Sequence, residues 1–462
     1  MRNNYITYCL LILFVLAGIL VSCNKKETST TLASETKLTG IVFAKNDSFP
    51  GIEKASFTII LEDDTSLVYN IDSLPCGTKL DSVIATFYFS TNIGYAMFKS
   101  DSAEKLISVS DTLNFNPRPC RLRVVSEDQK NERFYHIYVN VHQVDPDLYV
   151  WTQTQTSLYT GSCDVHAENF GGQILLYTQD GINVRLYTSA TGAVWSAPQT
   201  VIGLPSGADV RHIVQGLFGL YYAQGNTLYA STDGLVWIPT DCSATGLTLH
   251  NLLFSYNDSI WAVVSDAADD LWLATFAEGE MPAKQTQIGP LENYYRSAGE
   301  RFPVSDFSAI SFVGKSGRLR AMIMGGFDVD GNALNSRWNL EWIDTDIDKG
   351  CYRLENFTIE QPDFAELTGT SLVWYDERML LFGSTDADNT IIEYPVLESR
   401  DEGMNWYVPD SAQNMLPPTY VPRQRTTAVI TDESAILLIG GQTRTTTFSD
   451  VWRGKKNSID WQ

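Results

Sequence analysis

A short turn phrase recurs along the chain after residue 150, and it constrains the fold more than any other feature of the sequence. In each copy an apolar strand leads into a Ser, a small loop with Gly, and an aromatic residue. The clearest copies are SATGAVW ending at Trp195, STDGLVW ending at Trp237 and SRDEGMNW ending at Trp406. All eleven tryptophans lie from Trp151 onward. A recurring strand-and-turn unit indicates a repeat architecture, in which each unit buries its apolar face against its neighbours.

The chemistry of the phrase favours a tight β-hairpin turn. Ser and Asp side chains hydrogen-bond within the loop, Gly takes the positive φ, and the aromatic ring packs beneath it. The copy with Ser399, Asp401, Gly403 and Trp406 resembles the Asp box in full, and a degenerate copy, DIDKGCY, ends at Tyr352. Each copy is therefore expected to mark one repeat unit.

A second repeated phrase is a Gly-Gly doublet after an apolar strand. AMIMGG ends at Gly326 and ILLIGG ends at Gly441, and each doublet precedes a polar loop and an aromatic strand. This pattern is similar to Kelch repeats, and Arg423 stands where Kelch repeats often carry arginine.

The turn-end aromatic residues set the length of the repeat. They fall at Trp151, Trp195, Trp237, Tyr352, Trp406 and Trp461, with one missing between residues 237 and 352. The 310 residues from the first to the last, divided by six, give about 52 residues per unit. We therefore predict an all-β, six-bladed, Kelch-like β-propeller of four-stranded blades over residues 148–462.

The ring of blades needs a closing device, because an open propeller leaves two unpaired sheet edges. The final blade has three good strands before residue 462. Residues 149–157 alternate in polarity and are rich in Thr, which is typical of an edge strand. We predict that they pair with residues 447–454 as the outer strand of blade six.

Residues 38–145 carry short strand-like segments and no tryptophan. In the phrase CRLRVVSEDQKNERFYHIYVNVHQV, Leu122 and Val124 precede a polar turn, and Phe134 and Ile137 follow it. This alternation predicts a hairpin that closes a β-sandwich. The phrase also resembles the last hairpin of immunoglobulin-like domains on bacterial surface lipoproteins.

The first 22 residues have the layout of a secretory signal peptide, because a basic residue precedes an apolar run that is short for a membrane span. The LVSC phrase ending at Cys23 resembles the bacterial lipobox, which implies lipidation of the Cys23 thiol and cleavage before it. Lipidation would tether the mature protein to a membrane without spanning it. Residues 23–37 are polar and predict a flexible tether.

Lipobox, sandwich and propeller together resemble an uncharacterised family of Bacteroidota lipoproteins, with an N-terminal immunoglobulin-like β-sandwich and a galactose-oxidase-type propeller. The resemblance implies fold and location but no activity. It implies a lipid-anchored cell-envelope protein of the outer membrane, and it leaves open whether the protein faces the periplasm or the cell surface.

The charge of the chain limits its partners. The formal net charge is −22, and residues 146–462 alone carry 19 Lys and Arg against 39 Asp and Glu. Nucleic-acid binding requires a concentrated basic face, so we expect no nucleic-acid partner. An acidic excess of this size also repels anionic ligands.

Five cysteines follow Cys23. Two candidate disulfides are Cys76–Cys120 and Cys163–Cys242, which leaves Cys351 unpaired. The alternative is that these residues are buried free thiols.

Established site chemistries fit the sequence poorly. Sialidases share the Asp box, but the nearest phrase to their Arg-Ile-Pro strand is an RFP in mid-chain. Copper radical oxidases need two His, two Tyr and a Cys crosslinked to one Tyr; only His166, His212 and His250 are available, and no Cys lies in a persuasive setting. Asp344, Asp346, Asp348 and Glu355 have the spacing of a calcium loop, but Lys349 replaces the required Gly, so a turn is preferred. We predict no catalytic residue, metal or cofactor.

The role of one set of polar residues stays open. His166, His212 and His250 each come just before the predicted first strand of blades one to three. Asp306 takes that place in blade four, and Arg425 comes close to it in blade six. First strands line the central channel of a propeller, so the repeat brings these positions into one ring. The ring is either a polar ligand site or a set of side chains that satisfy backbone groups at the channel mouth.

These observations favour a lipid-anchored binding or scaffolding protein of the cell envelope, with a glycan or an envelope protein as the partner of the propeller. The alternative is a glycoside-active enzyme, a hydrolase or lyase, with its site on the propeller face. A third interpretation is a structural subunit of an envelope complex. Two carboxylates about 5–10 Å apart in one pocket would favour the enzyme.

Overall fold

The computed structural model describes residues 31–457, except 63–64, 102, 109–110, 162–163, 278, 289–301, 344–350, 357–366, 384–394 and 410–414. Cys23, the signal segment and the three aspartates of the candidate calcium loop lie outside the described residues. The described residues up to Asp145 form one compact unit, and those from Pro146 onward form a second. None of the helices in the described part of the chain is long and apolar enough to cross a membrane.

The N-terminal unit is a sandwich of two sheets. The larger sheet has the strand order β2 (Phe57–Ile60), β3 (Thr65–Asn70), β9 (Glu132–Tyr138), β8 (Cys120–Ser126), β5 (Ile93–Lys99) and β6 (Lys105–Leu106). The smaller sheet has the order β1 (Leu38–Phe43), β4 (Val83–Phe89) and β7 (Thr112–Leu113), and a short 3₁₀ helix, η1 (Ile52–Lys54), follows β1.

The predicted hairpin of this unit is present, because β8 and β9 pair antiparallel. Leu122 and Val124 of β8 are buried in the core, as expected. In β9, however, the inward face starts at Tyr135 rather than at Phe134, and Phe134 instead packs against the guanidinium of Arg121 at 5.0 Å.

A tyrosine can occupy this core position because its hydroxyl is satisfied. The Tyr135 hydroxyl donates to the carbonyl of Thr36 at 2.9 Å and accepts from the backbone N–H of Leu38 at 2.8 Å. These bonds tie the entering chain to the last strand of the sandwich, and they remove the cost of burying a polar group.

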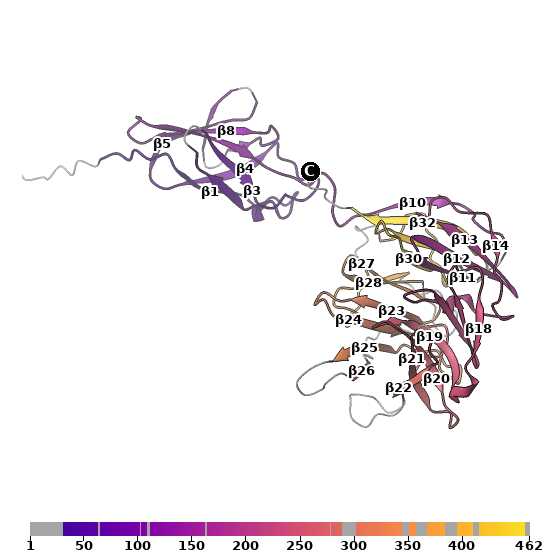
Figure 1. The fold of residues 1–462 in the computed structure, drawn as a ribbon. Coiled ribbons are helices and arrows are strands. Elements are labelled where there is room, and N and C mark those ends of the chain that lie inside the picture. Colours follow the sequence, from indigo (N-terminus) through magenta and orange to yellow (C-terminus); the bar gives the residue numbers. More distant parts are fainter. Residues whose placement is uncertain are drawn as a thin grey trace, which may run out of the picture. The chain divides into compact units, whose positions relative to one another are not determined.

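The second unit is a six-bladed propeller, so the predicted all-β fold is confirmed (Figure 1). Blade 1 contains β11 (Asp164–Phe170), β12 (Gln173–Asp180), β13 (Asn183–Ser189) and β14 (Gln199–Thr200). Blade 2 contains β15 (Val214–Gln215), β16 (Leu220–Gln224), β17 (Thr227–Ser231) and β18 (Ile238–Asp241). Blade 3 contains β19 (Thr248–Tyr256), β20 (Ser259–Ser265), β21 (Leu271–Phe276) and β22 (Ala283–Ile288).

Blades 4 and 6 also have the predicted four strands, whereas blade 5 has three among the described residues. Blade 4 contains β23 (Ser308–Val313), β24 (Leu319–Met324), β25 (Arg337–Ile343) and β26 (Cys351–Asn356). Blade 5 contains β27 (Ser371–Tyr375), β28 (Arg378–Phe382) and β29 (Val396–Ser399). Blade 6 contains β30 (Thr427–Ile430), β31 (Ile436–Gln442), β32 (Thr447–Lys456) and β10 (Tyr149–Gln155). Two 3₁₀ helices, η2 (Val210–His212) and η3 (Ser243–Thr245), precede blades 2 and 3.

The ring closes as predicted. β10 pairs antiparallel with β32, with Tyr149 opposite Lys456 and Gln155 opposite Val451 (Figure 1). The first strand of the unit thus completes the last blade. This pairing covers the edge that β32 would otherwise expose.

The core of the propeller lies between blades. Six apolar clusters fill the six interfaces of the ring, one for each pair of neighbouring blades. Between blades 6 and 1, Leu437 and Ile439 of β31 meet Val165 of β11 and Leu176 of β12. Each blade therefore buries both of its faces against its neighbours.

The turn phrase has the predicted geometry in blade 5. The Ser399 hydroxyl donates to Asp401 at 2.9 Å and accepts from the backbone N–H of Gly403 at 2.8 Å. The indole N–H of Trp406 donates to the carbonyl of Gly403 at 3.0 Å. The loop therefore satisfies its own polar groups and carries a buried ring beneath it.

The copies in blades 1 and 2 repeat this arrangement. Trp195 donates to the carbonyl of Gly192 at 3.1 Å, and Trp237 donates to that of Gly234 at 3.2 Å. The two glycines have φ of 77° and 76°. The same residue types thus produce the same turn at three places in the ring.

The glycine doublets stand where a side chain has no room. Gly325 has φ of 65°, and a Cβ there would lie 2.0 Å from the carbonyl oxygen of Leu367. Gly440 has φ of 62°, and a Cβ there would lie 2.1 Å from the hydroxyl of Tyr159. Both positions therefore require glycine.

Arg423 is a buried structural residue. Its guanidinium donates to both carboxylate oxygens of Asp450, at 2.5 and 3.2 Å, and lies between the rings of Tyr420 and Phe448, 4.2 and 3.8 Å from their centres. A bidentate pair between two aromatic rings is a favourable way to bury an arginine.

The cysteines that the structure describes are not in disulfides. Cys76, Cys120 and Cys242 are free, the first exposed and the other two buried. Both candidate pairs are therefore wrong, and the alternative of buried thiols holds for Cys120 and Cys242. Burial raises the pKa of the Cys120 thiol to about 12. Cys163 lies outside the described residues.

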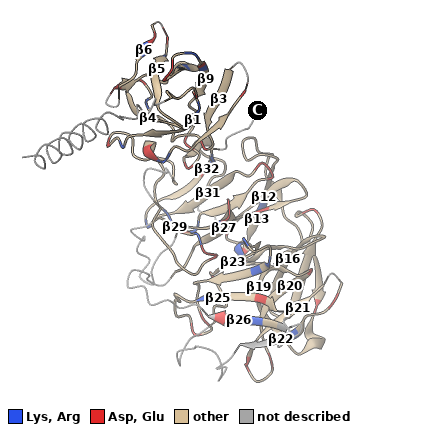
Figure 2. Cartoon of the chain, turned by 90° about the vertical axis from the view of Figure 1, so that its left-hand side faces the viewer, with Lys and Arg blue, Asp and Glu red and all other residues tan. Residues whose placement is uncertain are grey.

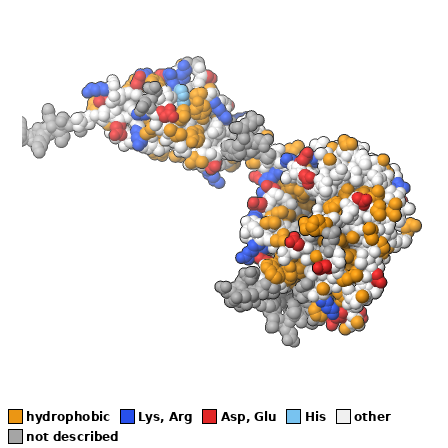
Figure 3. Space-filling model, viewed as in Figure 1, with side chains coloured by type: hydrophobic (Ala, Val, Ile, Leu, Met, Phe, Trp, Pro, Cys, Tyr) orange, Lys and Arg blue, Asp and Glu red, His pale blue; other side chains and the backbone are white. Residues whose placement is uncertain are grey.

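The outer part of blade 2 exposes apolar side chains. Ile202 and Val236 form a bridge between adjacent segments and are 61% and 45% exposed, and Ile238 on β18 is 67% exposed. Apolar side chains also form patches on the face of the propeller that Figure 3 presents. We call Ile202, Val236 and Ile238 the blade 2 patch.

Candidate functional site

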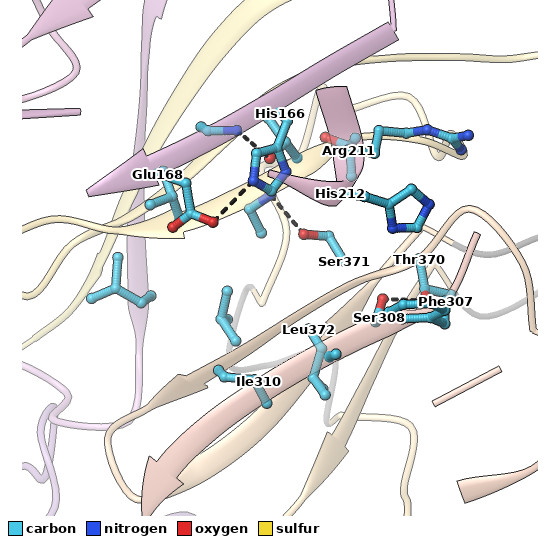
Figure 4. A pocket seen from close by; sticks show the side chains of 18 of the residues that line it. His166, Glu168, Arg211, His212, Phe307, Ser308, Ile310, Thr370, Ser371 and Leu372 are labelled. Atoms are coloured by element: carbon cyan, nitrogen blue, oxygen red, sulfur yellow. Dashed lines mark hydrogen bonds and ion pairs between the residues drawn. The ribbon is translucent and has the colours of Figure 1, made fainter. Parts of the chain in front are cut away.

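The inner strands of the propeller surround a central cavity. It consists of two overlapping hollows of about 430 and 490 Å³. Both are lined by residues of β11, β15 and β23 and by the end of η2, while β27 and β30 complete the first and β19 completes the second. The walls mix polar and apolar side chains, and Figure 4 shows several of them.

Four of the five ring residues predicted from the sequence line this cavity. His166 and His212 contribute to both hollows, and Asp306 and Arg425 contribute to the first. His250 is not among the lining residues. It is the extra residue of a β-bulge in β19, and its Nε2 lies 3.1 Å from the hydroxyl of Ser265. The bulge breaks the alternation on which the predicted ring depended.

The charged residues at one end of the inner strands form a chain of ion pairs. Arg211 donates to both carboxylate oxygens of Asp209, at 2.9 and 2.6 Å, and also to Asp306. Arg425 donates to Asp164 at 3.1 Å, and its second terminal nitrogen lies 4.0 Å from Asp306. The chain therefore links residues at the starts of blades 1, 2, 4 and 6.

The backbone positions these groups in a repeated way. Asp306, Gly369 and Arg425 each stand two residues before an inner strand, and their φ angles are 52°, 64° and 53°. A left-handed conformation is costly for Asp and Arg, so the surrounding structure has to hold it. The same left-handed backbone conformation thus recurs at the equivalent position of three blades, and a different residue adopts it in each.

The ion pairs fix the charge states of their members. Burial alone would lower the pKa of Arg211, but the hydrogen bonds to Asp209 and the charge of Asp306 raise it above its usual range. Burial likewise acts to raise the pKa of Asp209, and the Arg211 guanidinium outweighs it and holds that pKa well below the usual range. Both groups therefore stay charged.

His212 is a buried titratable side chain of the cavity wall. It is 5% exposed, and its ring lies 5.1 Å from that of Phe307. Burial lowers its pKa to about 4, so the imidazole is neutral at neutral pH. Its Nε2 has no hydrogen-bond partner among the described residues, and the nearest carboxylate oxygen, of Asp209, lies 3.7 Å away.

His166 forms a pair that the sequence analysis missed. Its Nε2 lies 3.0 Å from a carboxylate oxygen of Glu168, two residues further along β11 (Figure 4). Two residues apart on a strand means the same face, so the period of the strand could have revealed Glu168. Arg211, beside His212, was also missed, and no sequence signal relates it to Asp306.

Opposite charges are also paired on the blades themselves. On blade 4, Glu341 of β25 accepts from Arg318 at 3.2 Å and lies 4.0 Å from Arg353 of β26, where Figure 2 places charges of both signs. No group of three or more His, Cys, Asp or Glu with the geometry of a metal site occurs in the described ranges. Glu355, of the candidate calcium loop, pairs with Arg353 at 2.8 Å.

Fold and cavity together define a two-unit protein, a β-sandwich followed by a closed six-bladed propeller with a polar central cavity. Residues 145–462 match the DUF6242 beta propeller domain, and residues 22–139 match the N-terminal domain of the same family, a domain of unknown function. The chain belongs to the DUF6242 family.

No curated protein matches the sequence significantly. Similar solved structures include one titled "Structure of YjhT", with 9% identity and a TM-score of 0.44, which covers 64% of this chain and 96% of that one. Another is the BP39L lectin from Burkholderia pseudomallei, with 13% identity and a TM-score of 0.35, which covers 65% of this chain and 85% of that one. Neither likeness bears on function.

Proposed function

We propose that this protein is a lipid-anchored binding or scaffolding protein of the cell envelope, and that its propeller binds a glycan at the central cavity or an envelope protein at its rim. The observation that carries the proposal is the cavity itself. Its volume is that of a small-ligand site, and polar groups such as His166 and Gln215 share its walls with apolar ones such as Ile310 and Leu372.

The carboxylates of the cavity support binding over hydrolysis. Glycoside hydrolysis needs two carboxylates that are free to serve as acid and as base or nucleophile. Among the described lining residues, Asp306 is held by Arg211, and Glu168 is hydrogen-bonded to His166. Because Asp306 is held in an ion pair, these two residues do not supply the pair of free carboxylates that hydrolysis requires.

The scaffolding part of the proposal has separate support. The blade 2 patch is apolar and lies on the outside of the ring, away from the cavity lining. Exposed apolar surface of this kind is typical of protein contacts. An envelope protein is therefore the partner expected for this part of the rim.

Ligand binding at the cavity can be tested by filling it. Ser311 lines both hollows, whereas Ser316 is exposed on a turn of the same blade. Mature protein purified in detergent is screened on a glycan array, with Ser311→Trp and, as the matched control, Ser316→Trp. We expect glycan binding that Ser311→Trp abolishes and Ser316→Trp preserves. Binding that survives in Ser311→Trp would place the ligand elsewhere and contradict the proposal.

Lipid anchoring rests on the LVSC phrase ending at Cys23. We expect Cys23→Ala to lose both metabolic labelling with palmitate and co-sedimentation with membranes, because no thiol remains for the lipid. Ser22→Ala, which keeps a small residue before the cysteine, serves as the control and should be labelled normally. Equal labelling of the Cys23→Ala protein would refute the anchor.

A further inference from the structure

The arginines of the central cavity have little capacity to bind an anion. All three kinds of guanidinium nitrogen of Arg211 donate to Asp209 or Asp306. Arg425 donates to Asp164 and faces Asp306. A carboxylate or phosphate ligand would have to break these pairs before it could use either arginine.

The balance of charge around the cavity is negative. Four carboxylates, those of Asp164, Glu168, Asp209 and Asp306, stand against two guanidiniums, which leaves an excess of two negative charges when the imidazoles are neutral. Glu168 is the carboxylate of this set that has no guanidinium partner, and it lies 3.0 Å from the Nε2 of His166. Its side chain is 22% exposed, which leaves part of it open to the cavity that it lines.

An unsatisfied polar atom lies in the wall of the same cavity. His212 is buried and lines both hollows, yet its Nε2 lacks a hydrogen-bond partner among the described residues. A buried polar atom is normally satisfied by protein, ordered water or a ligand. His212 and Glu168 both contribute to the walls of the two hollows.

The remaining walls match a sugar ring better than a peptide strand. Gln215, Ser311 and Thr370 offer neutral polar groups, while Phe307 and Ile310 offer apolar surface. A ring with hydroxyls on its edge and C–H groups on its face uses both kinds of surface in an enclosed cavity. A peptide in extended form instead requires a groove with unpaired backbone groups.

We propose that the central cavity binds an unacetylated amino sugar, with its ammonium group on the carboxylate of Glu168 and its ring between the polar and apolar walls. This inference rests on the proposed function and assigns the chemical class of its ligand. The ammonium would bring one positive charge into a cavity with excess negative charge, and its N–H groups would donate to Glu168.

The proposal is tested by calorimetric titration of the mature protein with glucosamine, with N-acetylglucosamine as the uncharged control. We expect glucosamine to bind at least about tenfold more tightly, because acetylation removes the charge and a charge-assisted hydrogen bond. Equal or tighter binding of N-acetylglucosamine would overturn the proposal. So would binding of Nα-acetyl-lysine amide alone, which would assign the cavity to a lysine side chain.

Variants of Glu168 and Gln215 test where the ammonium group of the bound sugar lies. Glu168→Gln keeps the size of the side chain and should abolish the preference for glucosamine, whereas Glu433→Gln, the same change at an exposed site paired with Arg453, should leave it intact. Gln215→Glu adds a carboxylate to the cavity wall and should tighten glucosamine binding, which keeps the proposal testable if Glu168→Gln does not fold. An unchanged preference in a folded Glu168→Gln protein would overturn the assignment.

The binding results distinguish a failure of the ammonium site from a failure of the proposed function. Neutral glycans that bind and are blocked by Ser311→Trp, without any preference for the amine, would leave the proposed function standing and overturn the ammonium site. The absence of any ligand at the cavity would overturn both.

Discussion

The two units of this protein bury the apolar faces of their β-sheets in different ways. The sandwich has one continuous core between its two sheets. The propeller has six separate cores, one at each interface between neighbouring blades. A sheet of the sandwich needs only its partner sheet, whereas every blade needs both neighbours. The stability of the propeller is therefore a property of the closed ring.

The propeller itself contains a second contrast of the same kind. Its turns repeat a Ser, a Gly and a Trp whose indole N–H donates to the Gly carbonyl, as at Trp195, Trp237 and Trp406. At the inner ring the backbone site repeats, but Asp306 and Arg425 fill it with opposite charges. The residues that the blades share thus build the propeller, and the residues that differ between blades form the candidate binding site.

The distribution of tryptophan makes the first contrast measurable. Ten of the eleven tryptophans, from Trp151 to Trp452, lie in the propeller, so fluorescence reports mainly on that unit. Far-ultraviolet circular dichroism reports on both units. Comparison of the two signals during urea unfolding assigns each transition to a unit.

The largest effect is expected from opening the ring. Deletion of residues 149–155 removes β10, exposes the edge of β32 and takes Tyr149 out of the core between blades 5 and 6. We expect a loss of more than about 4 kcal/mol in the free energy of unfolding of the propeller, seen as an early or missing fluorescence transition.

A deletion of equal length from the predicted tether, residues 24–30, is the control for this experiment and should leave the fluorescence transition in place. A propeller that melts normally without β10 would mean that the blades do not depend on closure.

The next effect tests the independence of the sandwich. Leu122 is fully buried in its core, so Leu122→Ala should destabilise that unit by about 3 kcal/mol through lost burial and a residual cavity. The fluorescence transition should not move, and only the circular dichroism signal should change. A matching shift of the fluorescence transition would show that the two units unfold together.

A smaller effect is expected from the buried imidazole of the cavity. Burial lowers the pKa of His212 to about 4, below the ordinary value of about 6.5 expected in the unfolded chain. Between these values the unfolded chain binds the proton and the folded chain does not, so stability falls as the pH falls. The stability that the neutral His212 imidazole contributes is fully present above about pH 6.5. The free energy of unfolding should be lower by about 2 kcal/mol at about pH 5.

The measurement is the urea midpoint of the fluorescence transition at both pH values, for the parent and for His212→Gln. The variant should have the shallower pH dependence. Equal slopes for the two proteins would mean that His212 titrates normally in the folded state.

The smallest effect concerns a single turn at the rim. Asp401 accepts hydrogen bonds from Ser399 and from Asn405, so Asp401→Ala should cost about 1–2 kcal/mol of propeller stability. Asp180→Ala, at an exposed hairpin end of blade 1, should cost nearly nothing. Equal costs in thermal unfolding would indicate that the turn bonds contribute no more than an ordinary surface residue.

The architecture was predictable because its signals are local. The turn at Trp406 is specified by residues within eight positions, and the spacing of such turns gives the number of blades. Closure by residues 149–155 followed from the same logic, since the last blade lacked a strand. On β9, Ile137 faces the core as predicted, but Phe134 does not. Phe134 stands three residues before Ile137, and an odd spacing places two residues on opposite faces of a strand, so the period of the strand could have revealed Tyr135 instead.

The site was predictable only in part, for a physical reason. The repeat placed His166, His212, Asp306 and Arg425 around one channel, and the period of the strand contained Glu168 as well. The pairing of Arg211 with Asp306 joins residues 95 positions apart, and the exclusion of His250 depends on a bulge. A repeated sequence determines which positions face the axis, but the ion pairs that form there are decided by distances across the ring, which exist only after the ring has closed.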